Sequence, residues 1–148
     1  MSDQECHPAS ADCIFCRIIK GEIPSFRVYE DEHVFAFLDI GPVRPGHLLL
    51  LPKGHYGTVL DVPGDLGEPI LRGIQRLGRA VMEATNTAGF NCLQNTHEAA
   101  GQTVFHAHWH IIPRAAGDGL SHWPQTTSPD KERMRALADT IGRAAAKP

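Results

Sequence analysis

The 148-residue sequence has no apolar stretch long enough to cross a membrane, and Leu48–Leu51 is far shorter than such a span. It also has no excess of basic residues, since 14 lysines and arginines against 17 acidic residues give a formal net charge of −3. Proteins that hold a nucleic-acid polymer usually carry a strongly basic surface, so we expect no such partner. A small anionic ligand needs only local positive groups and is compatible with this charge.

The N-terminal residues are polar and acidic, and the apolar core of a secretion signal does not follow them. We therefore expect a cytoplasmic protein without membrane contact. Residues 1–12 show no apolar periodicity and are predicted to form a disordered tail. The length of the remainder predicts a single domain over residues 13–148.

Hydrophobic spacing predicts a long helix over Asp65–Thr87, closed by Gly89 as a left-handed cap. Its apolar face is expected to consist of Leu66, Ile70, Ile74, Leu77 and Val81. A short helix is expected over Cys13–Lys20, stopped by Gly21 and Pro24. A C-terminal helix is predicted to begin with Ser128 as N-cap and Pro129 in the first turn. Its apolar face would comprise Met134, Leu137, Ala138 and Ile141.

Short apolar segments between Pro and Gly residues predict the strands. They are expected at Phe26–Tyr29, Val34–Leu38, His47–Leu51, Phe90–Gln94 and Thr103–Ile112, with Pro113 ending the last of them. The early connections have hairpin length, which favours an α+β fold on a mostly antiparallel sheet. Cys92 is interpreted as a core residue of its strand.

Histidine alternates with apolar residues over His106–His110. Because side chains on a strand have a period of two, the three imidazoles are expected on one face, with Ala107 and Trp109 on the other. Imidazole can act as a nucleophile, a general acid or base, or a metal ligand near neutral pH. A solvated polar strand face and a three-histidine zinc site are the alternatives, although side chains from one flat strand converge poorly on a single ion.

The segment 102–114 resembles the His-φ-His-φ-His-φφ signature of the histidine triad (HIT) family, where φ is apolar. The resemblance extends to Cys13-Ile14-Phe15-Cys16, to Phe37-Leu38-Asp39-Ile40 and to Pro52-Lys53-Gly54-His55, and it covers residues 13–114. It is greatest to bacterial, Hint-like members that carry a Cys-x-x-Cys motif. It implies the HIT-type fold, with one long helix and a C-terminal helix beside the sheet.

In that family, the middle histidine attacks the α-phosphorus of a purine nucleotide and forms a nucleotidyl-histidine intermediate. The resemblance places this role on His108 and assigns contacts with the phosphate oxygens to His110. It places further phosphate contacts on Asn95, Gly101, Gln102 and Thr103, for which plain turn chemistry is the alternative.

The resemblance also implies that Asp39 binds the ribose hydroxyls, with Ile40 beside it and His47 buried near the nucleotide. For Asp39 the alternative is a loop cap. For His47 the alternative is a role confined to supporting His108. The purine base would lie against Phe15, Ile18, Ile23 and Phe37, although these residue types are equally typical of an ordinary core.

Cys13 and Cys16 have the spacing of a zinc knuckle, but a closed zinc site needs four ligands. The resemblance implies that His55 and His106 complete it as a structural site. A redox-active dithiol and a reduced pair packed as small apolar groups are the alternatives. Cys6 and His7 are a rival ligand pair in the expected tail.

Three functions fit these residues. The leading prediction is a nucleoside phosphoramidase, and the alternatives are a hydrolase of dinucleoside polyphosphates such as diadenosine tetraphosphate and a nucleotide-binding adaptor with negligible turnover. An intact His108 argues against the adaptor. The family commonly forms homodimers, and we expect one here through the long helix and the Phe90 strand.

Overall fold

A computed structural model describes residues 11–125, 127 and 130–148. The chain divides into two compact units, one ending at Asp118 and one beginning at Gly119. The expected tail lies outside the described residues except for Ala11 and Asp12, and so do Cys6 and His7. The single domain over 13–148 therefore stays a prediction.

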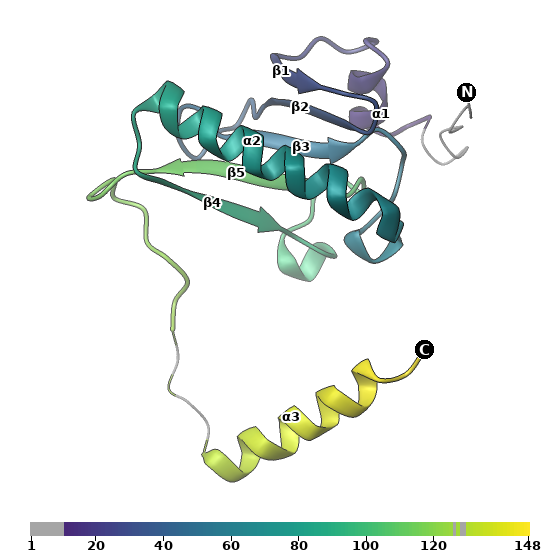
Figure 1. The fold of residues 1–148 in the computed structure, drawn as a ribbon, viewed down its shortest axis with the longest axis vertical. Helices are drawn as coiled ribbons and strands as arrows, with labels where there is room; N and C mark the ends of the chain where they lie inside the picture. The colour runs from purple at the N-terminus through teal and green to yellow at the C-terminus, as the bar shows by residue number, and fades with distance from the viewer. Residues whose placement is uncertain (1–10, 126, 128–129) are drawn as a thin grey trace. The chain divides into compact units, whose positions relative to one another are not determined.

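The first unit is built on a five-stranded antiparallel sheet in the order β1-β2-β3-β5-β4 (Figure 1). The strands are β1 (Arg27–Glu30), β2 (Val34–Leu38), β3 (Leu48–Pro52), β4 (Gly89–Gln94) and β5 (Trp109–Arg114). This arrangement confirms the predicted α+β fold class. Cys92 is exposed on β4 and is not the core residue that the sequence predicted, because β4 is an edge strand.

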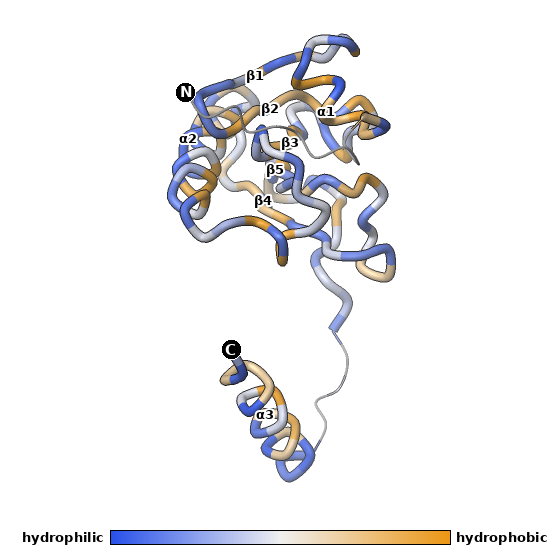
Figure 2. The backbone as a smooth tube through the Cα atoms, turned by 90° about the vertical axis from the view of Figure 1, so that its right-hand side faces the viewer, coloured by the Kyte–Doolittle hydropathy of each residue, from blue (hydrophilic) through white to orange (hydrophobic). Residues whose placement is uncertain are grey.

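The two faces of the sheet bury separate apolar clusters, because alternate side chains of each strand point to opposite faces. On one face, Val34, Leu48 and Ile111 pack with the long helix α2 (Gly67–Thr85). On the other face, Phe35 and Leu49 pack with the short helix α1 (Ile14–Ile19). In Figure 2, apolar and polar residues alternate along α2, whereas β2 and β3, which are covered on both faces, consist of apolar residues. The α1 face carries the candidate site.

Helix α2 lies across the sheet with its predicted apolar face inward: Ile70, Leu77 and Val81 are buried, and Ile74 is partly buried (Figure 1). The helix begins at Gly67, later than predicted, and Leu66 is buried in the 3-10 turn before it. A Cβ on Gly78 would lie 2.4 Å from the Phe90 ring, so this glycine permits the close contact with β4. The helix ends earlier than predicted, with Asn86 and not Gly89 as the left-handed cap at φ 51°. Asparagine tolerates this conformation, and Gly89 instead begins β4.

The last strand differs from its prediction at both ends. Residues 103–108 lie outside any strand, and β5 begins at Trp109. The ladder with β3 stops at Leu50 opposite Trp109, and β3 itself ends at Pro52, which has no N–H to donate. At the other end β5 continues through Pro113, which pairs with Phe90 of β4 but has no β3 partner, so its missing N–H breaks no bond there.

Within the described part of the first unit, 3-10 turns lie at Val59–Asp61, Gly64–Leu66 and Glu98–Ala100. The second unit contains α3 (Lys131–Ala145), the predicted C-terminal helix. Ser128 and Pro129 lie outside the described residues, and Asp130 caps the helix by accepting from the Arg133 N–H. In the part of the chain that the structure describes, no helix is long and apolar enough to cross a membrane.

Candidate active site and metal centre

The three alternating histidines gather on the α1 face of the sheet. His110 lies on β5 opposite Leu49, while His106 and His108 lie in the segment just before the strand. The rings of His108 and His110 are 5.1 Å apart, and Trp109 packs into the α2-side cluster. The alternation of faces was therefore predicted correctly, although only one of the three histidines is in a regular strand.

His108 has the protonation pattern that a nucleophile requires. Its Nδ1 lies 2.6 Å from the His106 carbonyl oxygen, which can only accept, so Nδ1 carries the hydrogen and Nε2 carries the lone pair. The side chain is buried among Phe15 and the other histidines, and this burial lowers the pKa of His108 below its usual value. His108 is consequently neutral at pH 7, with one nitrogen free to attack.

His47 and His110 form a hydrogen-bonded pair whose direction is fixed by the backbone. The Val43 N–H donates to His47 Nδ1 at 3.0 Å, so the remaining hydrogen of His47 is on Nε2. That Nε2 lies 2.9 Å from His110 Nδ1, which must accept, and the hydrogen of His110 is left on its own Nε2. Burial lowers the pKa of His47 and lowers that of His110 to about 4, so both rings are neutral and His110 presents one N–H donor.

Asp39 lies beside this pair, with its Oδ2 3.5 Å from His47 Nε2. The ligand-type atoms of Asp39, His47 and His110 lie close enough together to surround a metal ion. The hydrogen-bond direction opposes such a site, because the His47 Nε2 that would bind the metal carries the hydrogen. The other carboxylate oxygen, Oδ1, accepts from the Gly41 N–H at 2.8 Å, as in a loop cap. The cluster is thus a hydrogen-bonding relay with a half-buried carboxylate at its edge.

The loop before the triad is held by Gln102, whose side chain is buried. Its amide donates to the carbonyls of Gly57 and Val104, at 2.7 and 3.1 Å, and accepts from the His97 N–H. Both amide hydrogens are therefore engaged within the protein. Gly101, with φ 94°, donates its N–H to the Glu98 carbonyl at 2.9 Å, while Thr103 is exposed and Asn95 is half-buried nearby.

The four residues expected around a purine base lie in the α1-side cluster, next to the histidines. Phe15, Ile18 and Phe37 are buried, Ile23 is partly buried, and the Phe15 ring meets the His108 ring edge-on at 5.1 Å. They are core residues, and Phe15 also forms a wall of the histidine site. Ile40 is 88% exposed on the loop after Asp39, where it has no core role.

Two cysteines and two histidines converge beside the triad. Cys13 and Cys16 come from the start of α1, His55 from the turn after β3, and His106 from the triad itself. Their ligand atoms all lie within 4.8 Å of one another. Burial lowers the pKa of His106 to about 4, and its Nε2–H donates to the Pro52 carbonyl at 2.9 Å. The lone pair on Nδ1 therefore faces the sulfur atoms.

The spacing of these atoms fits a tetrahedral ion. His106 Nδ1 lies 3.6 Å from Cys13 Sγ and 3.5 Å from Cys16 Sγ, and His55 Nδ1 lies 3.3 Å from Cys16 Sγ. Ordinary zinc bond lengths place sulfur and nitrogen ligands about 3.6 Å apart. The carbonyl bond that fixes the His106 tautomer is also the kind of support that metal-binding histidines usually have. This cluster could hold a metal with no open position for substrate.

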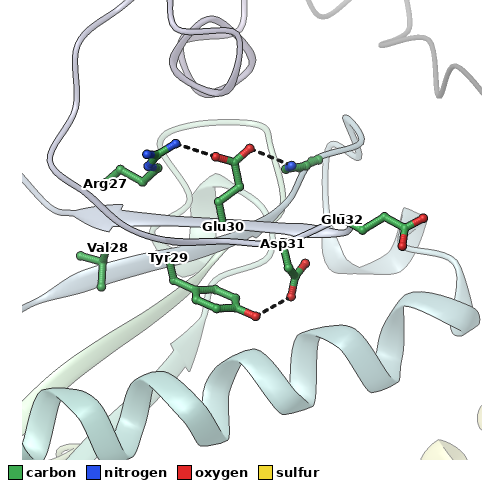
Figure 3. A pocket seen from close by; sticks show the side chains of 7 residues that line it. Arg27, Val28, Tyr29, Glu30, Asp31 and Glu32 are labelled. Atoms are coloured by element: carbon green, nitrogen blue, oxygen red, sulfur yellow. Dashed lines mark hydrogen bonds and ion pairs between the residues drawn. The ribbon is translucent and has the colours of Figure 1, made fainter.

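Apart from the histidine site, a hollow at the outer edge of the sheet is lined mostly by charged residues (Figure 3). There Glu30 lies between Arg27 and Lys53, at 2.8 and 2.7 Å, and Tyr29 donates to Asp31 at 2.9 Å (Figure 3). These charges already neutralise one another in an open position. Because Lys53 is held in an ion pair with Glu30 and Tyr29 donates to Asp31, we place the candidate site on the histidine face.

The sequence did not predict the groups that orient the histidines. Two are backbone carbonyls, of His106 and Pro52, and a third is the Val43 N–H. Every residue has such groups, so no residue type marks them. An ion-pair cluster around Asp118, described below, was also missed, because its members are far apart in the sequence.

Residues 20–117 match the HIT domain. The chain belongs to the HIT family. It is 42% identical over 135 residues to the protein called hit of Bacillus subtilis, which covers 89% of this chain and 93% of that one. An adenosine 5′-monophosphoramidase of Saccharomyces cerevisiae is 43% identical over 129 residues, covering 84% of this chain and 79% of the yeast protein.

Two solved HIT structures extend this likeness to the fold. A HIT-family member from Bacillus subtilis is 40% identical with a TM-score of 0.85, over 93% of this chain and 99% of that one. A zinc-bound histidine triad family protein from Mycobacterium smegmatis is 38% identical with a TM-score of 0.72, over 91% and 99% of the two chains. The resemblance inferred from the motifs is thereby confirmed.

Proposed function

We propose that this HIT protein is a nucleotide hydrolase or transferase that acts at the α-phosphate of purine nucleotide conjugates. The observation that carries the proposal is the hydrogen bond from His108 Nδ1 to the His106 carbonyl. It leaves a neutral, buried imidazole with its Nε2 lone pair free, between Phe15 and His110.

The reaction would follow two displacements, which divide one hard step into two easier ones. His108 Nε2 attacks the α-phosphorus, the bond from phosphorus to the leaving group breaks, and the leaving group takes up a proton from solvent, which the attacking water of the second step returns. Water then attacks the nucleotidyl-histidine, giving the nucleoside monophosphate and restoring neutral His108. In a transferase, another nucleophile replaces the water.

The relay through His47 would stabilise the phosphoryl oxygens during both steps. Because His110 Nδ1 accepts from His47, its Nε2–H is the donor that remains for the substrate. A fixed donor aimed at developing negative charge is an effective form of catalysis. The further phosphate contacts that we propose are the Asn95 and Thr103 side chains. Gly101, which has no Cβ, would let the loop backbone approach the phosphate closely, while Gln102 holds the loop in place.

The nucleoside would lie between Asp39 and the apolar wall. We assign the ribose hydroxyls to Asp39 and the base to the side of Phe15, Ile18, Ile23 and Phe37, with Ile40 closing over it. The exposed position of Ile40 suits such a contact with a ligand. We further propose a cytoplasmic homodimer formed through α2 and β4.

We propose that Cys13, Cys16, His55 and His106 bind one structural zinc ion. The zinc-bound relative from Mycobacterium smegmatis and the sulfur–nitrogen distances of 3.3, 3.5 and 3.6 Å in the cluster support this assignment. A bound ion would hold α1, the turn after β3 and the triad segment together. His106 links this site to the nucleophile through its carbonyl, so the ion would support alignment and take no direct part in the reaction.

The possible enzymatic activities differ in the leaving group that is released from the α-phosphate. Two relatives named adenosine 5′-monophosphoramidase, from Saccharomyces cerevisiae and Candida albicans, favour a phosphoramidase. The test is to measure kcat/KM for an adenosine 5′-phosphoramidate and for diadenosine tetraphosphate under the same conditions. A higher value for the phosphoramidate supports the proposal, and the reverse order supports a dinucleoside polyphosphate hydrolase. Nucleotide binding with no turnover of either would make the protein an adaptor.

Asp39→Ala is expected to weaken the binding of ribonucleotides much more than the binding of their 2′,3′-dideoxy analogues. The variant loses a charged acceptor for the ribose hydroxyls, worth about 1.5–3 kcal/mol, or roughly 10- to 150-fold in Kd. Calorimetry with AMP and 2′,3′-dideoxy-AMP measures both losses. Equal losses for the two ligands would remove Asp39 from the ribose site.

Turnover is expected to resist mild acid. Burial lowers the pKa of His108, so the neutral form that attacks remains dominant as the pH falls through the ordinary histidine value. An unperturbed histidine would keep only about a quarter of its neutral form at pH 6. We expect kcat to fall less between pH 7.5 and pH 6 than the roughly fourfold loss of an unperturbed histidine. A fourfold loss over this range would contradict a depressed pKa at the nucleophile.

A further inference from the structure

The loop between β2 and β3 carries both Asp39 and His47, and its own backbone bonds fold it tightly. The Asp39 N–H donates to the His47 carbonyl, and the His47 N–H donates to the Arg44 carbonyl, each at 3.0 Å. Gly46, with φ 93°, lies so close to α2 that a Cβ would be 2.7 Å from Thr85. These contacts fix the base of the loop and leave the Arg44 side chain to fix its outer part.

Arg44 reaches a cluster centred on Asp118, whose side chain is only 3% exposed. One carboxylate oxygen of Asp118 lies 2.9 Å from Arg44 Nη1 and accepts from Arg114 Nε at 2.8 Å. The other accepts from Arg114 Nη2 at 3.1 Å, and Arg114 Nη1 donates to Asn91 at 2.6 Å. The cluster therefore joins the loop to the end of β5 and to the edge strand β4.

The charges in this cluster make Asp118 its central member. Two guanidinium groups face its one carboxylate, and the Nε of Arg44 is buried without a hydrogen-bond partner among the described residues. A half-buried arginine in this state depends on its ion pair to remain in place. Without the Asp118 carboxylate, the Arg44 guanidinium is expected to move toward solvent, and the loop that carries it is expected to shift as well.

We infer that Asp118 is a positioning residue for the nucleotide: through Arg44 it holds the loop that aims Asp39 at the ribose and His47 at His110. This inference rests on the proposed function for its consequences in binding, but the positioning itself does not. Asp118 lies at the far end of β5 from His108, and the contacts above connect it to the loop through Arg44 and to β5 through Arg114. Its expected effect is therefore on ribose recognition, with the nucleophile left intact.

The positioning is tested by amide hydrogen exchange in the full chain. We expect Asp118→Asn and Arg44→Met to accelerate exchange of the Asp39 and His47 amides by at least about tenfold, because their bonds close the loop. Arg44→Lys keeps the charge and should restore part of the protection. Glu68→Gln is the matched control, since it breaks an exposed ion pair with Arg72 on α2. Unchanged protection in both Asp118→Asn and Arg44→Met would overturn the inference.

The consequence for binding is tested by comparing AMP with 2′,3′-dideoxy-AMP. Asp118→Asn should reduce the preference for AMP by at least about fivefold, and in the Asp39→Ala background it should reduce it no further, because both act on the same contact. A lower Tm with an unchanged preference for AMP over 2′,3′-dideoxy-AMP would show that Asp118 has only a structural role and would overturn the inference. If the unmodified protein shows no preference for AMP, the ribose assignment fails, while the exchange result still decides whether Asp118 positions the loop.

Discussion

His108→Asn is expected to lower kcat by at least about a thousandfold while AMP still binds. Asparagine fills much of the same space but has no nitrogen lone pair that can attack phosphorus. The His106 carbonyl and the His110 donor do not depend on the His108 side chain, so the phosphate contacts should survive. Steady-state turnover and calorimetric AMP affinity measure the two effects separately.

The nucleotidyl-histidine gives this prediction a direct chemical check. Acid-free quenching during turnover, followed by mass spectrometry, should find the nucleotidyl group on the peptide containing His108 and none on the variant. His33→Asn is a matched control, because His33 is a partly exposed histidine in the β1–β2 turn. A variant at position 108 that retains more than a few per cent of turnover would show that another group is the nucleophile.

The sequence predicted those parts of the site that depend on local pattern. Period-two alternation placed His110 and Trp109 on opposite faces, and period-3.6 spacing identified the buried side of α2. The HIT resemblance placed Cys13 and His106 in one cluster, although they are 93 positions apart, and the structure brings their ligand atoms together. Spacing alone could not have paired these residues.

The sequence failed where tertiary contacts override local preference. The triad segment was predicted as one strand through His106, but its partner β3 ends at Pro52, and the chain before Trp109 leaves the ladder. The Ala107 N–H instead donates to the Tyr56 carbonyl at 2.7 Å. This departure lets the His106 ring turn to the cysteines while its carbonyl accepts from His108. The irregular backbone is therefore what connects the Cys/His cluster to His108.

Cys13→Ser is expected to reduce bound zinc from about one ion per chain to well below one and to lower Tm. The four ligands come from α1, the turn after β3 and the triad segment, so the ion would join three segments that are distant in the sequence. Serine is a poor zinc ligand, and Cys13 is only half-buried, so the substitution itself creates little cavity. A loss of about 3 kcal/mol would lower Tm by roughly 10 °C in a domain of this size.

Turnover at low temperature should fall much less than zinc content, because the cluster leaves no open position for substrate and acts only through alignment of His106 and His108. Metal analysis of protein purified without chelator or added zinc, together with calorimetry and a turnover assay at 10 °C, measures the three quantities. Cys92→Ser is the matched control, since Cys92 is exposed on β4 and lies outside the cluster. Zinc-free protein with freely titratable thiols at both Cys13 and Cys16 would reject the metal assignment. The nucleotide site would then stand without it, because His108 is oriented by a backbone carbonyl and His110 by His47.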